Sequence, residues 1–462
     1  MAYQIPYNQP RIYTNLAQWI NRNGISQENN IIYHEAGIEN NYANTDFNLH
    51  PSSNQSLSGV WELEPHNYYV FNPSQEVDGS PKNLWFSQFY AKQVEGDNGL
   101  YYPHYNVRLS NLRNLFDSLL TGNGYIALLG SNLYEKNLMF KFCVRFYERN
   151  EENTDFDRNS NGTLKIKEFT FTTEPLYNCD ANAFGHYTMP SSNGSCMAKI
   201  KGATLSVNDK YIQGITVKLV DKNYVWENPE TETLEGVASN ALNNGQYEDI
   251  KVGSIAFGTY WDFPVNSDLN LKFNRSFGGV KTSRSLGGFD TTNINHTGAP
   301  TWATGSAWSD EMNPETDQGG ISIANIVNKT DFEAFKRTGR RSWNLNFKGL
   351  RDYQIMNENE VPRNNHHYAS ATNNGTNYNT DNNEINSDAI NVKWNFGLHS
   401  GGADDFFSNV LNKTYGAEKF IFQPDKEDFS SLALAKFNQK SFSFTQSSHK
   451  FFDIALNIEE VW

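Results

Sequence analysis

The residues whose types and spacing could do chemistry begin at Asp157. The run Asp-Arg-Asn-Ser-Asn-Gly-Thr-Leu-Lys-Ile-Lys-Glu, residues 157–168, satisfies the template of a calcium-binding loop. Calcium favours such a loop because it binds roughly six to eight hard oxygen atoms at once. The same residues also make an ordinary Asn-Gly hairpin turn, and the chain that follows alternates like a strand, so both interpretations stay open. The predicted calcium ligands are Asp157, Asn159, Asn161, Thr163 and Glu168.

Other patterns that would indicate catalysis are missing from the sequence. It contains no GxSxG motif, no P-loop and no Cys/His pair in a recognisable setting. Asp404-Asp405 and Glu459-Glu460 are carboxylate pairs, but neighbours in sequence do not converge on one bond as an acid and a base must. The three cysteines form neither a disulfide framework nor a zinc motif. We therefore expect a protein that is not an enzyme and needs no cofactor, calcium excepted.

Composition narrows the class of protein further. Aromatic residues make up 14% of the 462 residues, which favours strands with large side chains. The net charge is −14 and only 19% of residues are charged, which argues against a protein that binds nucleic-acid phosphates. The N-terminal residues lack the pattern of a signal peptide, and no apolar run is long enough for a membrane anchor. These features predict a β-rich protein of several domains that is made and assembled in a cytoplasm.

The pattern along the chain divides it into four expected regions. Leu16, Trp19 and Ile20 form a helical apolar stripe in an N-terminal arm, and short strands separated by Asn, Ser, Gly and Pro turns follow. Two low-complexity insertions interrupt the last region. The regions are an arm and short helix (1–30), a jelly-roll β-sandwich (31–178), connecting strands and a linker (179–245), and a second β domain (246–462) with insertions at 290–320 and 357–388.

Several strands and one helix are specific enough to be compared with a structure. Trp343, Leu345 and Phe347 share one face of a strand, and Ile454 to Glu460 alternate in the same way near the C-terminus. Residues 404–413 predict a helix with an acidic start and Gly416 just past its end. The other predicted strands are 58–63, 68–71, 85–90, 125–129, 139–147, 164–171, 198–207, 211–219 and 434–444.

Four segments together resemble the tube-like domain of bacteriophage tail proteins, especially distal tail and baseplate ring proteins. They are the run Gly-Thr-Tyr-Trp-Asp-Phe-Pro-Val-Asn-Ser-Asp-Leu (258–269), the glycine-rich block 278–288, the strand 339–347 and the C-terminal residues 419–462. The resemblance covers about residues 251–462 and implies an antiparallel β-barrel or sandwich with one flanking helix. It implies a structural part of a virion tail.

That resemblance also implies partners. A distal tail ring is expected to be a homo-hexamer that contacts tube, hub, tape-measure and fibre proteins, with DNA passing through its lumen without specific binding. Arg340 and Arg341 precede the Trp343 strand, and an arginine pair can bind carboxylates bidentately across a subunit interface. A solvated strand edge is the alternative for this pair.

The N-terminal half resembles the galactose-binding-like jelly rolls that some phage tail proteins carry. The segment 125–133, Tyr-Ile-Ala-Leu-Leu-Gly-Ser-Asn-Leu, resembles a strand and turn of those domains, but Ser131 stands where they usually have histidine. The resemblance suggests an alternative function, a receptor-binding tail protein that recognises host-surface glycans. Trp61, Trp85 and Tyr90 are the candidate aromatic platforms for such glycans.

Overall fold

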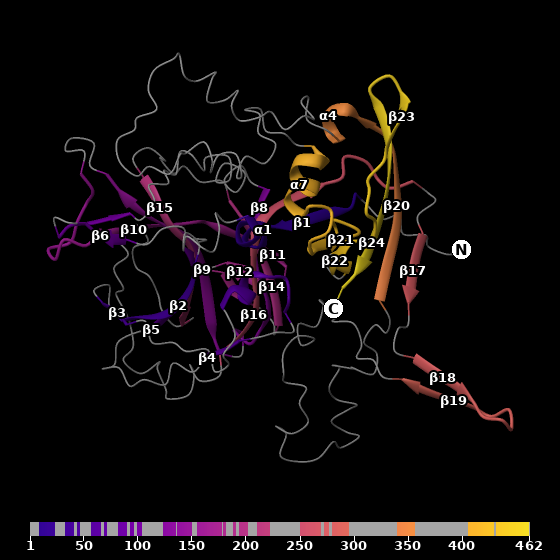
Figure 1. The fold of residues 1–462 in the computed structure, drawn as a ribbon, viewed down its shortest axis with the longest axis horizontal. Helices are drawn as coiled ribbons and strands as arrows, with labels where there is room; N and C mark the ends of the chain where they lie inside the picture. The colour runs from indigo at the N-terminus through magenta and orange to yellow at the C-terminus, as the bar shows by residue number, and fades with distance from the viewer. Residues whose placement is uncertain are drawn as a thin grey trace.

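The structure, a computed structural model, is mainly β, as the sequence predicts. The part of the chain that the structure describes forms two large antiparallel sheets, two separate hairpins and a few short helices (Figure 1). The described residues are 9–23, 33–40, 44–46, 57–65, 69–71, 82–89, 93–96, 99–103, 123–134, 136–149, 155–177, 179–181, 188–190, 194–201, 210–221, 250–268, 272–276, 280–294, 340–355, 405–428 and 431–461.

The larger sheet has twelve strands and combines segments from both ends of the chain. Ten strands follow one another across it, while β4 (Tyr69–Phe71) pairs with β16 and β23 (Phe444–Ser448) pairs with β24. The order of the ten is β11 (Thr173–Tyr177), β14 (Gly194–Ile200), β8 (Gly124–Ser131), β16 (Ile250–Asp262), β1 (Arg11–Asn15), β21 (Phe420–Gln423), β22 (Ala433–Phe437), β24 (Phe451–Glu460), β20 (Arg340–Arg351) and β17 (Lys272–Ser276).

The smaller sheet has eight strands and packs against the larger one. Phe142 of β9 points at the larger sheet, where its ring lies 5.3 Å from the ring of Phe257 in β16. At this contact the two sheets lie face to face. The strand order is β12 (Cys179–Ala181), β13 (Thr188–Pro190), β9 (Leu138–Glu148), β15 (Lys210–Asp221), β5 (Lys82–Phe89), β2 (Tyr33–Asn40) and β3 (Asn44–Asp46), with β10 (Ile166–Thr170) on β9.

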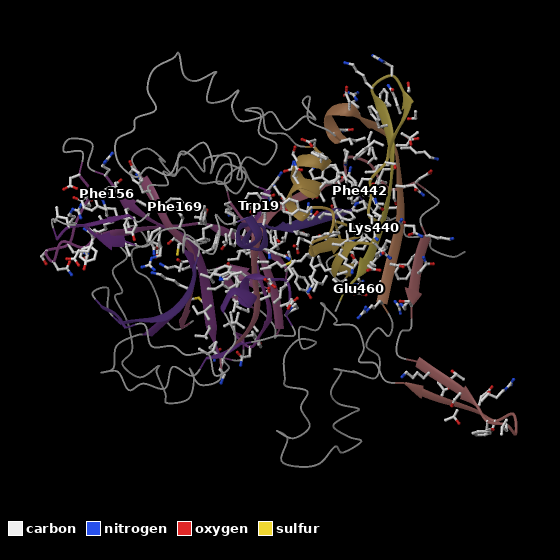
Figure 2. The ribbon with its side chains drawn as sticks, viewed as in Figure 1. Trp19, Phe156, Phe169, Lys440, Phe442 and Glu460 are labelled. Carbon is white, nitrogen blue, oxygen red and sulfur yellow. The ribbon has the colours of Figure 1, made fainter. Side chains whose placement is uncertain are left out.

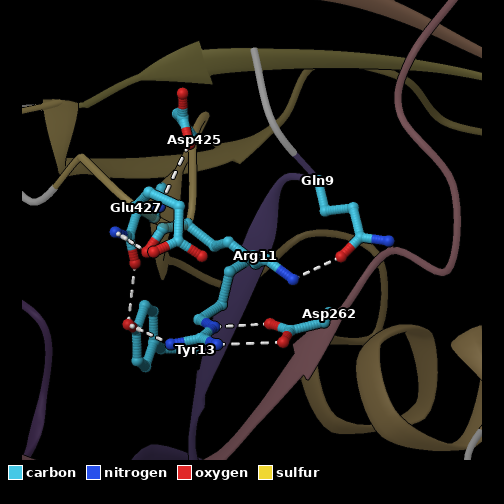
Figure 3. Close-up of polar contacts among 8 residues, drawn as sticks. Gln9, Arg11, Tyr13, Asp262, Asp425 and Glu427 are labelled. Atoms are coloured by element: carbon cyan, nitrogen blue, oxygen red, sulfur yellow. Dashed lines mark hydrogen bonds and ion pairs between the residues drawn. The ribbon is translucent and has the colours of Figure 1, made fainter.

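The N-terminal strand β1 lies in the middle of the larger sheet, between β16 and β21. Arg11 forms a two-point ion pair with Asp262 of β16 (Figure 3). Its guanidinium lies 4.1 Å from the centre of the Tyr260 ring. On the other side, the Tyr13 hydroxyl donates to Oε1 of Gln423 at 2.8 Å. The first described strand thus joins the two halves of the sheet, which the sequence pattern of an arm does not indicate.

Gly258 lets β1 approach β16 closely. A Cβ atom at this position would lie 2.0 Å from the carbonyl oxygen of Thr14. Real Cβ atoms do not come so near to a backbone oxygen, so the pairing of Asn15 with Gly258 requires glycine. Gly258, the first residue of the run 258–269, is therefore a point of close backbone contact with the N-terminal strand.

The helices confirm some predictions and correct one. The stripe of Leu16 and Trp19 forms α1 (Leu16–Asn23), as expected. Residues 58–63, predicted as a strand, contain the 3₁₀ helix η2 (Leu57–Trp61), because Trp61 inserts its ring against Phe257 instead of alternating along a sheet. The other described helices are α4 (Asp352–Ile355), the π-helical turn η9 (Phe407–Leu411) and α7 (Asn412–Thr414). The predicted helix 404–413 contains η9 and the first two residues of α7.

A hydrophobic core lies between β20, β24 and η9. Trp343, Leu345 and Phe347 are buried on one face of β20, and Leu456 is buried on β24, so both predicted strand faces are confirmed. Phe263 stacks on Phe347 with ring centres 4.2 Å apart. Such aromatic stacking fills a thin core efficiently.

One expected segment differs from the structure, and two others lie partly or wholly outside the described residues. The predicted strand 434–444 is two elements, β22 and the start of β23, separated by a turn that contains the half-buried Phe442. Figure 2 places Phe442 beside this C-terminal region. Of the insertion 290–320 only β19 (Asp290–Ile294) is described, and the insertion 357–388 lies wholly outside the described residues.

Candidate assembly surface and the predicted sites

Strand β17 forms an exposed edge of the twelve-stranded sheet. All five of its residues, from Lys272 to Ser276, are exposed, and β20 is its sole partner among the described strands. Phe273 keeps 42% of its surface exposed although its ring lies 6.0 Å from that of Trp343. An edge of this kind presents backbone N–H and C=O groups to which a further strand can pair.

The hairpin of β18 (Val280–Arg284) and β19 follows β17 and projects away from both large sheets (Figure 1). Its turn is closed by three hydrogen bonds between Ser285 and residues 288–289, with Gly288 in the left-handed region at φ +80°. Leu286 is fully exposed at the tip and Phe289 is 73% exposed. Large apolar side chains at the end of a projecting hairpin are typical of a contact with another molecule.

This surface is positively charged, whereas the protein as a whole is acidic. Residues 272–294 contain four basic residues and a single acidic one, Asp290, in a chain whose net charge is −14. Arg284 pairs with Asp290 at 2.9 Å, where both side chains are largely exposed. The other three cations are on exposed strand or hairpin positions, so this surface would attract an acidic partner. They are Lys272, Arg275 and Lys281.

Arg341, predicted at a subunit interface, is instead buried within its own chain. Its Nη2 lies 2.7 Å from Oε1 of Glu460, and its Nε donates to Oε2 of the same carboxylate at 3.1 Å. Further bonds run to the carbonyl oxygens of Ser431 and Leu432. Arg341 therefore does bind a carboxylate through two bonds, but this carboxylate belongs to Glu460 at the end of β24 in the same chain. Arg340, the other residue of the pair, is exposed at the start of β20, opposite Ser276 of β17.

The predicted calcium-binding segment, residues 157–168, forms a hairpin turn whose two arms pair with each other. Arg158 and Leu164 form a bridge, Gly162 donates its N–H to the carbonyl of Asn159 at 3.0 Å, and Gly162 has φ +83°. The Oδ1 atom of Asn161 accepts hydrogen bonds from the backbone N–H and the hydroxyl of Thr163. These are the contacts of an Asn-Gly turn.

The two carboxylates of the calcium template are occupied by lysines. Asp157 pairs with Lys167 at 2.6 Å, and Glu168 pairs with Lys141 at 2.9 Å and Lys218 at 2.7 Å. Within the described ranges, no group of three or more His, Cys, Asp or Glu residues could hold a metal ion. With both carboxylates paired to lysines, the arrangement is that of a hairpin turn and does not fit a calcium loop.

Glu168 is the centre of a nearly buried charge cluster on the smaller sheet. Its side chain is 10% exposed, and those of Lys141 and Lys218 are 5% and 6% exposed. Burial alone would raise the pKa of Glu168, but the positive charges of Lys141, Lys218 and Arg145 together hold it well below its usual range. The cluster joins β9, β10 and β15 by charge in the interior, and sequence patterns did not indicate it.

The predicted glycan platforms do not form a described surface. Trp61 is only 1% exposed, so its ring is not available to a sugar. Trp85 lies in β5, opposite Lys218 of β15, and Tyr90 lies outside the described residues. The structure therefore brings none of the three together in a described site.

Comparisons with protein-family models, with curated proteins and with solved structures found no match. Among the described helices, none has the length and apolar character needed to cross a membrane.

The sequence interpretation missed the edge strand and the hairpin as a surface. Two features of the sequence indicate this surface. Polar and apolar residues alternate from Asn270 to Phe273, as in a strand, and the glycine-rich block 278–288 contains the basic residues Lys281 and Arg284. What the pattern could not supply was the position of β17 at the end of a sheet. That position depends on pairing with β20, which lies far along the chain.

Proposed function

We propose that this chain is a structural component of a bacteriophage tail that forms a ring at the distal tail or baseplate. In this proposal the ring continues the tail tube and anchors neighbouring tail proteins. The resemblance of residues 251–462 supports the class of protein. The observation that carries the assembly is the exposed edge β17, continued by a projecting hairpin with an apolar tip.

The partner of this surface is a second copy of the chain. An exposed strand edge of a soluble protein is a liability unless it is covered, and in a homo-oligomer a neighbouring copy covers it. One surface binding a different surface of the next copy generates a closed ring when the rotation closes. The basic edge and hairpin meet a neighbour whose overall charge is −14, so attraction between copies is expected.

The larger sheet gives such a ring a rigid frame. Strand β1 bonds β16 on one side and β21 on the other, so the half of the sheet bearing β17 is hydrogen-bonded to the half that packs on the smaller sheet. A force on the edge strand is thus carried through continuous backbone pairing. This property suits a protein that joins a tube to other tail parts.

Charge reversal at the edge tests the proposed contact. The double variant Lys272→Glu, Arg275→Glu changes two exposed side chains and leaves the buried core untouched. We expect it to shift the particle mass measured by mass photometry from rings to single chains at equal concentration, because like charges then face each other across the interface.

A matched control reverses two exposed lysines elsewhere. Lys165 is exposed just before β10 of the smaller sheet, and Lys201 is exposed just after β14, near the end of the larger sheet opposite to β17. Lys165→Glu, Lys201→Glu carries the same charge change and should keep the assembly of the unmodified protein. Equal loss of assembly in both double variants would mean that net charge, and not the β17 edge, governs association.

A further inference from the structure

Lys413 is a buried lysine whose amine lies against an asparagine side chain. It is 4% exposed, in α7 at the point where the helical segment packs on β16. Its Nζ donates to Oγ1 of Thr259 at 2.6 Å and to Oδ1 of Asn409 at 3.2 Å. Asn409 precedes Lys413 by four residues, so the two side chains lie along the same side of the helical segment.

The asparagine amide is held from its other end as well. Its Nδ2 donates to the backbone carbonyl of Asp405 at 3.1 Å. The Asp405 carboxylate is 1% exposed and accepts the backbone N–H of Ser408 at 2.7 Å. The carboxylate, the amide and the amine therefore belong to residues 405, 409 and 413, which follow one another at intervals of four residues along one largely buried helical segment.

Burial makes the amine a nucleophile. Desolvation lowers the pKa of Lys413 to about 7, against the opposing charge of Asp405, which favours the protonated form. A neutral amine in a water-poor site can attack a carbonyl carbon atom. Because the amine is already held beside the amide, the reaction is intramolecular and its entropic cost is low.

From this juxtaposition we propose that Lys413 and Asn409 form an intramolecular isopeptide bond. The amine Nζ attacks Cγ of Asn409, the new Nζ–Cγ bond forms, the Cγ–Nδ2 bond breaks, and ammonia leaves. The proton lost by Nζ is the proton gained by Nδ2, and the Asp405 carboxylate carries it between them. The reaction neither consumes nor releases electrons and requires no co-reactant.

Thr259 and the helix give the reaction its geometry. The Thr259 hydroxyl fixes the amine from the β16 side, and a rotation of the Asn409 amide about Cβ–Cγ turns the face of its carbonyl group toward the amine. The product is a covalent cross-link across one helical turn. This turn packs on β16, the strand that pairs with β1. The proposal is independent of ring assembly, since every participating atom belongs to one chain.

Mass spectrometry of the full-length purified protein tests the bond. We expect an intact mass lower than the sequence mass by one ammonia molecule. Peptide mapping should give a peptide that trypsin does not cleave after Lys413, with fragment ions that place the bridge between residues 409 and 413. An unmodified mass, or normal cleavage after Lys413, would overturn the proposal.

Variants separate this bond from cyclisation of the asparagine on its own backbone, which releases the same molecule. Lys413→Met and Asn409→Ala should both restore the full sequence mass, whereas Lys419→Met, a lysine paired with Glu64 in the same region, should keep the loss. A mass loss that persists in Lys413→Met would overturn the proposal. The bridged peptide is sought in the protein of native sequence, so the test does not depend on the folding of any variant.

Discussion

Arg341 and Glu460 form a buried two-point ion pair between positions 119 residues apart. The pair closes the first residues of β20 onto the last residue of β24, beside the Trp343 ring, which lies 5.1 Å from the guanidinium. Figure 2 labels Glu460 at the lower end of the C-terminal strands. The end of β24 is thus fixed by charge as well as by strand pairing.

Removing one member of this pair should destabilise the protein strongly. Arg341→Met leaves the Glu460 carboxylate buried without its cation, which costs about 3–5 kcal/mol in comparable buried pairs. We expect a lower urea midpoint with an unchanged slope. The double variant Arg341→Met, Glu460→Met should recover most of the loss, and a double variant as unstable as the single one would contradict the charge argument.

A methyl group at Gly258 should disturb the junction between β1 and β16. The added Cβ of Gly258→Ala would meet the Thr14 carbonyl oxygen at 2.0 Å, so one strand must move, at a cost of about 1–3 kcal/mol. Thermal unfolding measures this cost. Gly287→Ala, where the nearest atom is the Ser285 hydroxyl at 3.9 Å, is the control and should change stability little.

The Glu168 cluster should make the free energy of unfolding decrease at acidic pH. Its pKa is lower in the folded than in the unfolded chain, so its contribution is fully present above the unfolded value. It is lost as the pH falls below that value toward the folded pKa, because protonation then favours the unfolded chain. Unfolding free energies measured from pH 6 down to acid should fall less steeply for Glu168→Gln than for the unmodified protein, and parallel curves would contradict this.

Calcium should leave the hairpin of residues 157–168 unchanged. Lys167 already neutralises Asp157, and Lys141 and Lys218 neutralise Glu168, so no open ring of oxygen ligands is offered. The melting temperature should be the same in excess calcium and in excess chelator. A calcium-dependent rise that disappears in Asp157→Asn would restore the calcium interpretation.

The apolar hairpin tip should matter for assembly but not for folding. Leu286 and Phe289 contact solvent rather than a core, so Leu286→Ser, Phe289→Ser should leave the urea midpoint of the single chain unchanged. It should weaken association between copies, seen as a smaller average particle mass at a given concentration. Unchanged association would remove the hairpin tip from the interface.

The sequence predicted those elements whose pattern is local. The alternation of Trp343, Leu345 and Phe347 gave a strand and its buried face, and the stripe around Leu16 and Trp19 gave a helix. In both cases burial follows directly from the spacing of apolar residues. The mainly-β class followed from the same kind of evidence.

Features that depend on long-range pairing could not be predicted. Arg11 meets Asp262, 251 residues away, and a short N-terminal run carries no sign that it will become a central strand. The partner of Arg341 was expected on another subunit because only the folded register brings Glu460 beside it. The sequence predicts a surface platform at Trp61, whereas the residue is buried, because a lone aromatic residue has the same local pattern in both environments.

The mass and shape of the unmodified protein test the central claim most directly. Mass photometry with negative-stain imaging, over a range of concentrations and at low and moderate salt, reports the number of copies and their arrangement. The account predicts closed rings of about six copies with a central hole, favoured at low salt because the basic edge attracts an acidic neighbour. A single chain at every concentration, or a compact trimer without a hole, would contradict it.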